Sequence, residues 1–284
     1  MALVTMKKLL TQAQKDKKGV GAFSVGNMEM NCGAIQAAEE LNVPIILQIA
    51  QVRLKHSPLL LMGPMMVEVA RKANVDVAVH LDHGLDIETL KQALDYGFTS
   101  VMLDSSSYSI EENIERTKKA VELASKYGAT VEAELGVVGG SEDGKSDNGI
   151  ICTNPQEAKK FCEETGVDAL AVAIGNAHGN YPVAPKLAFD VLSEIYSKVQ
   201  GLPLVLHGGS GISDEDFQEA IRRGITKVNI ATASFNSLTK QVQSYLLRAD
   251  KPDYFGLNEA MKEGTYKNIK HHIRVFEMED VRLL

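Results

Sequence analysis

The sequence predicts an α/β protein folded as a (β/α)8 TIM barrel with a helical C-terminal extension. Short apolar segments alternate with helix-period segments eight times within the 284 residues, which matches the order and length of such a barrel. The apolar segments are continuous, as expected for parallel strands that helices cover. No Gly-x-Gly-x-x-Gly motif opens a helix, which disfavours an open doubly wound sheet. We therefore predict one domain over residues 1–284.

The expected strands are short, apolar and rich in β-branched residues. They cover residues 20–25, 43–49, 75–83, 100–104, 130–135, 169–174, 202–206 and 227–230. The expected helices cover residues 5–18, 28–41, 58–73, 86–96, 110–127, 187–199 and 214–223. A further helix begins at Pro155 with Asn154 as its N-cap. The chain after Asp250 is expected to be helical and to pack outside the barrel or against a neighbouring subunit.

Composition disfavours several classes of partner. The formal net charge of −7 offers no electrostatic reason to bind nucleic acid or an anionic membrane. No apolar run approaches the roughly 18 residues of a transmembrane helix, and residues 1–18 lack a signal-peptide core. Cys32, Cys152 and Cys162 are widely spaced, which is typical of reduced thiols. We expect a cytoplasmic protein whose partners are small molecules.

Histidine and carboxylate side chains concentrate where the predicted strands end. In chain order they are Asp82, His83, Asp104, Glu132, Glu134, His178 and His207. Because barrel enzymes place their active sites at the C-terminal ends of the strands, these side chains should meet on one rim. Their convergence favours a shared site over independent structural roles.

Three of these residues suggest a metal centre. His83, His178 and His207 form the three-imidazole set that typically holds catalytic zinc. Glu134 and Asp104 are candidates for further ligands, or for carboxylates that orient the imidazole N–H groups. The sequence therefore predicts a zinc site on this rim.

The third strand raises a geometric difficulty. Asp82 and His83 are adjacent, so regular strand geometry points their side chains to opposite faces. A site that uses both residues requires a bend, and we predict irregular backbone geometry beside Gly84. His80 shares the Asp82 face and is expected to support the site or to be a buried, hydrogen-bonded residue.

The loops after the seventh and eighth strands lie where barrel enzymes commonly bind phosphate. They contain Gly208, Gly209 and Ser210 in one loop and residues 229–232 in the other. Glycines let backbone N–H groups approach an anion, and the N-terminus of a following helix favours its charge. We expect a phosphate site here, with a pair of ordinary tight turns as the alternative.

Six sequence blocks between residues 80 and 232 resemble one known family. They are residues 80–84, 100–104, 131–136 with 139–143, 177–181, 206–211 and 227–232. In this respect the chain resembles the class II, zinc-dependent ketose-bisphosphate aldolases, which include the fructose- and tagatose-bisphosphate aldolases. The resemblance implies reversible retro-aldol cleavage of a phosphorylated ketose to dihydroxyacetone phosphate and an aldehyde, by a homodimer or homotetramer.

The resemblance also implies roles for individual residues. It assigns zinc to the three histidines, with Glu134 and Asp104 at alternative or accessory positions. It makes Asp82 the proton donor and acceptor at the hydroxyl formed or broken with the carbon–carbon bond. Glu142, on the loop after the fifth strand, would remove a proton from dihydroxyacetone phosphate. No Schiff-base lysine is needed, and we place Lys227 at the start of its strand, away from the rim.

Substrate contacts are implied in the same way. The residues assigned to the phosphate and hydroxyls of dihydroxyacetone phosphate are Gly179, Gly208, Gly209, Ser210, Asn229, Ile230, Ala231 and Thr232. Family members often bind a monovalent cation, Na⁺ or K⁺, near this phosphate. We therefore expect zinc and, beside the phosphate, such a cation.

Two segments depart from the family pattern. Family members that cleave bisphosphates usually carry Asp-Pro-Arg in the C-terminal region, whereas residues 251–253 read Lys-Pro-Asp. After the second strand, Arg53 and His56 stand where the family commonly has small residues. We predict that Arg53 or His56 binds a distal substrate group other than phosphate; the alternative is that both are solvated loop residues.

Two other functions are compatible with the same residues. A zinc barrel of this kind could isomerise or epimerise a sugar phosphate, in which case one product forms instead of two. A non-catalytic barrel could bind a sugar phosphate as a sensor. The combined set of three histidines, Asp82 and Glu142 argues against the second alternative.

Overall fold

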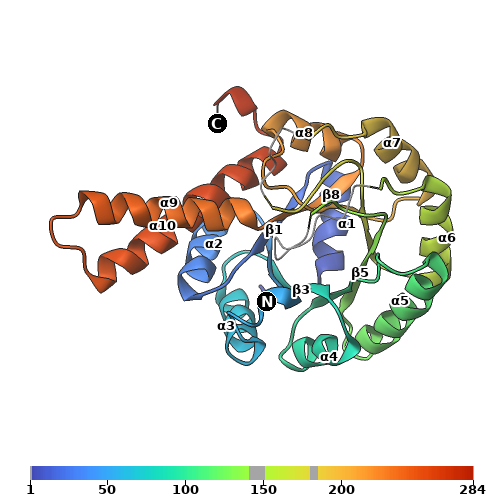
Figure 1. Cartoon of the computed structure of the whole chain (residues 1–284), viewed down its shortest axis with the longest axis horizontal. Helices are drawn as coiled ribbons and strands as arrows, with labels where there is room; N and C mark the ends of the chain where they lie inside the picture. Colours follow the sequence, from blue (N-terminus) through green and yellow to red (C-terminus); the bar gives the residue numbers. More distant parts are fainter. Residues whose placement is uncertain (1, 141–150, 180–184, 284) are drawn as a thin grey trace.

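The computed structural model describes residues 2–140, 151–179 and 185–283. Eight parallel strands close into a barrel in chain order, as predicted (Figure 1). The strands are β1 (Val20–Ser24), β2 (Ile45–Ala50), β3 (Val77–Gly84), β4 (Ser100–Leu103), β5 (Thr130–Leu135), β6 (Ala169–Val172), β7 (Leu204–Leu206) and β8 (Ile225–Ile230). The eighth strand begins two residues earlier than expected, so the placement of Lys227 at its start was wrong.

Helices surround the barrel in the expected order (Figure 1). They are α2 (Met28–Leu41), α3 (Leu59–Lys72), α4 (Ile87–Asp95), α5 (Ile110–Ser125), α6 (Pro155–Thr165), α7 (Phe189–Lys198) and α8 (Asp214–Arg222), with 3₁₀ turns at η1 (Gln51–Arg53) and η2 (Val281–Leu283). The Asn154 side chain accepts from the N–H groups of Gln156 and Glu157, which confirms the predicted cap of α6. None of the helices in the described ranges is long and apolar enough to cross a membrane.

Strand side chains pack into two separate cores. Outward-facing residues such as Leu47 and Val79 join the large core between barrel and helices. Inward-facing Ile46 and Ala78 join a small core inside the barrel. Because both faces are buried, the strands read as continuous apolar runs rather than as alternating patterns.

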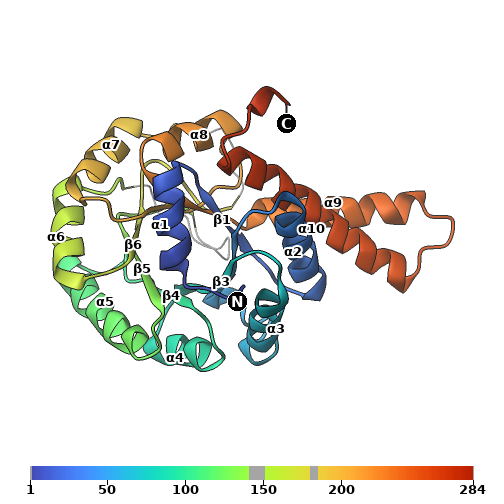
Figure 2. The same cartoon turned by 180° about the vertical axis from the view of Figure 1, so that it is seen from behind.

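Helix α1 (Met6–Asp16) closes the N-terminal end of the barrel (Figure 2). Its Met6, Leu9 and Leu10 are buried against the inward-facing residues of the strands. Thr5 caps the helix by accepting from the Lys8 N–H group. The interior is therefore filled at this end, and polar chemistry is confined to the other.

The chain after β8 forms a helical hairpin. Helix α9 (Thr232–Arg248) leads away from the barrel, and α10 (Tyr254–Phe276) returns along it to pack on α2 (Figure 1). The turn between the two helices lies at the far end of the projecting hairpin (Figure 1). The expected helical tail outside the barrel is confirmed.

The predicted irregularity in β3 is confirmed. The pairing of β3 with β4 shifts register between Leu81 and Gly84, and His83 has a φ of 42°. A Cβ atom on Gly84 would lie 2.4 Å from the carbonyl oxygen of Met102, so the backbone needs glycine there. The bulge turns His83 toward the rim while Asp82 stays on the inward face.

Candidate active site and metal centre

Three imidazoles meet at the C-terminal rim. His83 follows the β3 bulge, His178 lies in the loop after β6, and His207 follows β7 directly. The ring centroid of His83 is 4.9 Å from that of His178 and 4.6 Å from that of His207. Glu134 of β5 joins them, with the ligand atoms of all four residues within 4.8 Å of one another.

Two carboxylates determine which imidazole nitrogens carry hydrogen. His83 Nδ1 lies 2.8 Å from Asp104 Oδ2, and His207 Nε2 lies 2.7 Å from Glu132 Oε1. Because an ionised carboxylate can only accept, these nitrogens are the protonated ones. Asp104 thus orients an imidazole, which is one of the two roles expected for it.

The remaining ligand atoms face one another across the centre of the cluster. His83 Nε2 lies 2.9 Å from His207 Nδ1, and Glu134 Oε2 lies 3.1 Å from the same nitrogen. Glu134 Oε2 is buried without a hydrogen bond. Lone pairs this close repel unless a cation lies between them, so this donor set fits a bound metal ion.

The electrostatics of the cluster favour positive charge at its centre. Burial lowers the pKa of His207, but the neighbouring carboxylates of Glu132 and Glu134 outweigh burial and raise it to about 9. Burial likewise lowers the pKa of His83, yet the charge of Asp82 and the hydrogen bond to Asp104 raise it well above its usual value. The surrounding carboxylates therefore supply the negative field that a metal cation requires.

Asp82 lies inside the barrel mouth, beside the histidine cluster. Its side chain is 1% exposed, and each oxygen accepts a hydrogen bond. Asn229 Nδ2 donates to Oδ1 at 3.1 Å, and Gln48 Nε2 donates to Oδ2 at 3.1 Å. Two amide donors thus hold the carboxylate in one orientation, as a positioned proton-transfer group requires.

The expected phosphate loops lie side by side. Gly208 has a φ of 64°, and a Cβ atom there would lie 2.1 Å from the carbonyl oxygen of Ala177. On Gly209, a Cβ atom would lie 2.8 Å from the carbonyl oxygen of Asn229. Only glycine allows these backbones to approach so closely.

The N-terminus of α9 opens beside these glycines. Its N-cap residue is Ala231, whose side chain makes no capping hydrogen bond, and Ser210 Oγ accepts from the Ala233 N–H group. Thr232 begins the helix. Ile230 is fully buried in the outer core, so only its backbone can contribute to a site. A long helix whose first turn has little side-chain capping is a favourable place for an anion.

Comparisons with known proteins agree with this geometry. A sequence profile described as fructose-bisphosphate aldolase class-II matches residues 4–281. The chain belongs to this family. It is 41% identical to the fructose-bisphosphate aldolase of Staphylococcus aureus strain Mu50 over 278 residues, covering 95% of this chain and 97% of that protein. The Staphylococcus epidermidis (strain ATCC 12228) enzyme is 40% identical over 284 residues, covering 97% and 98%.

The crystal structure of the YdjI aldolase from Escherichia coli K12 is similar with a TM-score of 0.87 and 36% identity. It covers 96% of this chain and 97% of that one. The protein is therefore a class II aldolase, an aldehyde-lyase that catalyses retro-aldol cleavage in a metal-dependent family that acts on phosphorylated ketoses.

The two departures from the family pattern have structural counterparts in this aldolase. Arg53, in η1 after β2, places its guanidinium carbon 4.6 Å from the ring centroid of Phe235 in the first turn of α9. Asp253 caps α10 by accepting from the Gly256 N–H group at 2.7 Å. Asp253 lies in the turn of the projecting hairpin, where it caps α10. His56, which follows η1, is exposed.

Other predicted residues of the aldolase have mixed outcomes. Gly179 has a φ of 87° and directly follows His178. His80 is fully buried, and its Nδ1 lies 2.7 Å from Ser100 Oγ, in agreement with a buried, hydrogen-bonded histidine. Glu142 lies outside the described residues.

Sequence reasoning missed two inward-facing polar residues. Gln48 holds Asp82, and Lys227 lies fully buried in the middle of β8. Lys227 Nζ is 2.8 Å from Glu132 Oε2. The sequence could have predicted this position of Lys227. Lys227 and Asn229 are two residues apart in one strand, so their side chains lie on the same face of the sheet.

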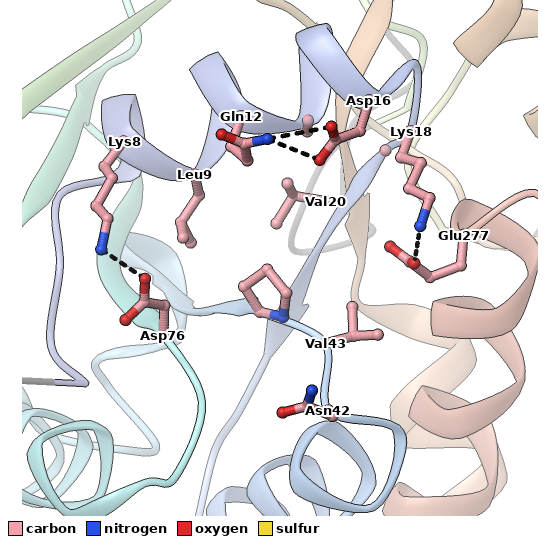
Figure 3. A pocket seen from close by; sticks show the side chains of 13 residues that line it. Lys8, Leu9, Gln12, Asp16, Lys18, Val20, Asn42, Val43, Asp76 and Glu277 are labelled. Atoms are coloured by element: carbon pink, nitrogen blue, oxygen red, sulfur yellow. Dashed lines mark hydrogen bonds and ion pairs between the residues drawn. The ribbon is translucent and has the colours of Figure 1, made fainter.

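A cavity of about 500 Å³ lies at the opposite end of the aldolase, between α1 and the starts of the strands. Figure 3 shows Lys8 reaching Asp76 and Lys18 reaching Glu277 along its edge. The two ion pairs measure 2.6 and 2.5 Å. Its charged side chains thus satisfy one another, in contrast to the unsatisfied atoms at the rim.

Proposed function

We propose that this aldolase uses zinc to cleave a phosphorylated ketose reversibly to dihydroxyacetone phosphate and an aldehyde. The carrying observation is that ring nitrogens of His83 and His207 face each other at 2.9 Å beside Glu134. His178 completes the imidazole set, with Asp104 in an accessory role. Bound zinc would supply Lewis-acid polarisation of the ketose carbonyl.

Proton transfers are assigned to two carboxylates. In cleavage, Asp82 takes the proton from the hydroxyl whose carbon–carbon bond breaks, and in synthesis it returns that proton. Its fixed orientation between Asn229 and Gln48 supports this role. Glu142 delivers a proton to the three-carbon fragment, which leaves as dihydroxyacetone phosphate.

The phosphate of the three-carbon fragment is assigned to the glycine loops. Backbone N–H groups of Gly179, Gly208 and Gly209 would contact it, with the hydroxyl of Ser210. The remaining contacts are assigned to residues 229–232, where α9 begins. A monovalent cation, Na⁺ or K⁺, would lie near the same phosphate. The N-cap residue Ala231 makes no capping hydrogen bond, which supports an anion beside the first turn of α9.

Metal removal and product analysis test the proposal together. Chelation should abolish cleavage, and stoichiometric Zn²⁺ should restore it. Mass spectrometry should then find two fragments from one ketose. A single isomeric product would favour the isomerase or epimerase alternative, and binding without turnover on a panel of ketose phosphates would favour the non-catalytic barrel. Membership in the aldolase family supports cleavage.

We further propose that the distal end of the ketose carries a group other than the usual phosphate, bound by Arg53 or His56. Asp253 at the matched C-terminal position caps a helix and cannot attract an anion. Arg53 lies on the rim beside the start of α9. Fructose and tagatose bisphosphates should therefore be poor substrates. Cleavage of either at ordinary aldolase efficiency would contradict this assignment, and Arg53→Ala should then leave KM unchanged.

The hairpin supports a homodimer or homotetramer. Its far end exposes Leu247 (86%), Phe255 (76%) and Tyr254 (67%), which would gain free energy by burial against a second copy. Light scattering should report a dimer or tetramer, and Leu247→Lys with Phe255→Lys should weaken it. The three free cysteines are consistent with a cytoplasmic protein.

A further inference from the structure

Among the described residues of the barrel mouth, Lys227 is a buried charged side chain to which the proposed chemistry gives no role. It lies on the inward face of β8 and is fully buried. A lone ammonium group in such a place is costly, so it persists only where strong partners compensate it. Its Nζ is 2.8 Å from Glu132 Oε2 and 2.7 Å from Asn229 Oδ1.

The contact with Asn229 determines the orientation of that amide. An ammonium group only donates, so Asn229 must turn its oxygen toward Lys227. Its nitrogen then points the other way and donates to Asp82 Oδ1 at 3.1 Å. Without a donor at position 227, the amide oxygen of Asn229 would lose its partner, and the amide would no longer be held in this orientation. In the flipped orientation its oxygen would face the Asp82 carboxylate, and the two oxygens would repel each other.

Through Glu132, Lys227 is connected to His207, one of the proposed metal ligands. One oxygen of Glu132 faces Lys227, while the other accepts from His207 Nε2 at 2.7 Å. The buried carboxylate is thus held between the ammonium group of Lys227 and the ring of His207. The ionised carboxylate keeps the hydrogen of His207 on Nε2 and leaves Nδ1 facing the metal cluster.

We propose that Lys227 is a positioning residue that couples the metal ligand His207 to the proton-transfer group Asp82. One arm runs through Glu132 to His207 and the other through Asn229 to Asp82. The inference rests on the roles proposed above for these two end residues. A single side chain of β8 thereby positions both the group assigned to metal binding and the group assigned to proton transfer.

The same contacts exclude a different use of this region. His80, Asp82 and Glu132 are all buried and close enough to suggest a second cation site. The ammonium group of Lys227 lies 2.8 Å from Glu132 and already supplies the cation there. Burial and the charge of Lys227 also lower the pKa of His80 well below its usual value, so His80 stays neutral.

Two matched double variants test the proposal. Lys227→Met with Glu132→Gln removes both charges of the buried pair, and the amide oxygen introduced at position 132 can still accept from His207. Lys227→Gln with Glu132→Gln has the same net charge but restores an amide that can donate to Asn229. Replacing both members of a buried ion pair is often tolerated, whereas removing one leaves an unpaired charge.

The readouts separate the two halves of the reaction. Exchange of solvent deuterium into dihydroxyacetone phosphate needs the metal and Glu142, whereas cleavage also needs Asp82. In the Met/Gln variant we expect full zinc content, exchange within about threefold of wild type, and kcat for cleavage reduced about 100-fold, the size of a small misplacement of a catalytic group. KM should be unchanged. The Gln/Gln variant should recover about tenfold of the lost kcat.

Three outcomes would overturn the inference. They are cleavage by the Met/Gln variant within about threefold of wild type, equal loss of exchange and cleavage, and equal kcat for the two folded variants. If the Met/Gln variant does not fold, the Gln/Gln variant decides, because it must then cleave within about tenfold of wild type. Wild-type protein with zinc that neither exchanges nor cleaves would instead refute the proposed function.

Discussion

The inward-facing strand residues differ in kind between the two ends of the barrel. At the N-terminal end, Ala22, Ile46 and Ala78 pack under α1 without a polar atom to satisfy. Toward the C-terminal end, the inward positions are polar, and Gln48 and Asn229 both donate hydrogen bonds to Asp82. The end under α1 buries apolar side chains, whereas the rim gathers imidazole and carboxylate ligand atoms within 4.8 Å of one another.

The metal centre should show the largest effect of any single change. His207→Ala removes a ligand and leaves Glu132 without its hydrogen-bond donor. We expect cleavage to fall about 1,000-fold or more, since metal polarisation of a carbonyl contributes several kcal/mol to catalysis. Zinc content by plasma mass spectrometry should fall in parallel. Full activity with zinc absent would show that the cluster does not hold the catalytic metal.

Asp82 should come next. Asp82→Asn keeps the size of the side chain but removes the proton acceptor, so we expect kcat for cleavage to fall about 1,000-fold, within the range of general acid–base catalysis. Zinc content should stay at the wild-type level because Asp82 is outside the imidazole set. A decrease smaller than about tenfold would assign proton transfer to another group.

Gly208 tests the close approach of the loop after β7 to the loop after β6, which carries His178. Gly208→Ala forces a Cβ atom toward the carbonyl oxygen of Ala177, so we expect about 2 kcal/mol of destabilisation and a higher KM for the ketose phosphate. Gly201→Ala is the matched control, because its φ is 86° but its Cβ would meet open space. It should cost about 1 kcal/mol and leave KM unchanged. Equal KM values in both variants would remove the phosphate role from this loop.

A buried histidine on α10, outside the barrel, predicts an acid sensitivity of the fold. Burial lowers the pKa of His272, on α10, to about 4. Because the unfolded chain has the higher pKa, near 6.5, it binds the proton more readily between these values. About 3 kcal/mol of stability, present above pH 6.5, should be lost as the pH falls to 4.

Denaturant unfolding against pH measures this loss. His272→Gln should remove it, whereas His271→Gln should not, since His271 is 38% exposed and paired with Asp214. An unchanged pH profile in the His272 variant would place the acid sensitivity elsewhere.

The smallest effect on stability and activity is expected at the surface of the N-terminal end of the barrel, which α1 closes. Lys8→Ala breaks an ion pair with Asp76 whose side chains are 59% and 37% exposed. Solvent screens such pairs, so stability should change by about 0.5 kcal/mol or less, with kcat and KM unchanged. A larger change in kcat would mean that the cavity under α1 communicates with the rim.

The sequence by itself determined the order of elements, the barrel and the gathering of three histidines at one rim. Eight continuous apolar runs with intervening helices leave little freedom in topology. Even the β3 bulge was predictable, because adjacent Asp82 and His83 could serve one site only if the strand bent. These features depend on local patterns and on the general rule that barrel sites lie at strand ends.

Only the tertiary structure decided which polar side chains at the rim contact one another. Asp104 bonds His83, and Glu132 bonds His207, although the sequence pointed to Asp104 and Glu134 as the candidates for orienting an imidazole. Lys227 looked remote because its strand was expected to begin at residue 227 itself. Which inward-facing groups touch depends on the stagger between neighbouring strands, and that stagger is set by closing all eight strands into one barrel.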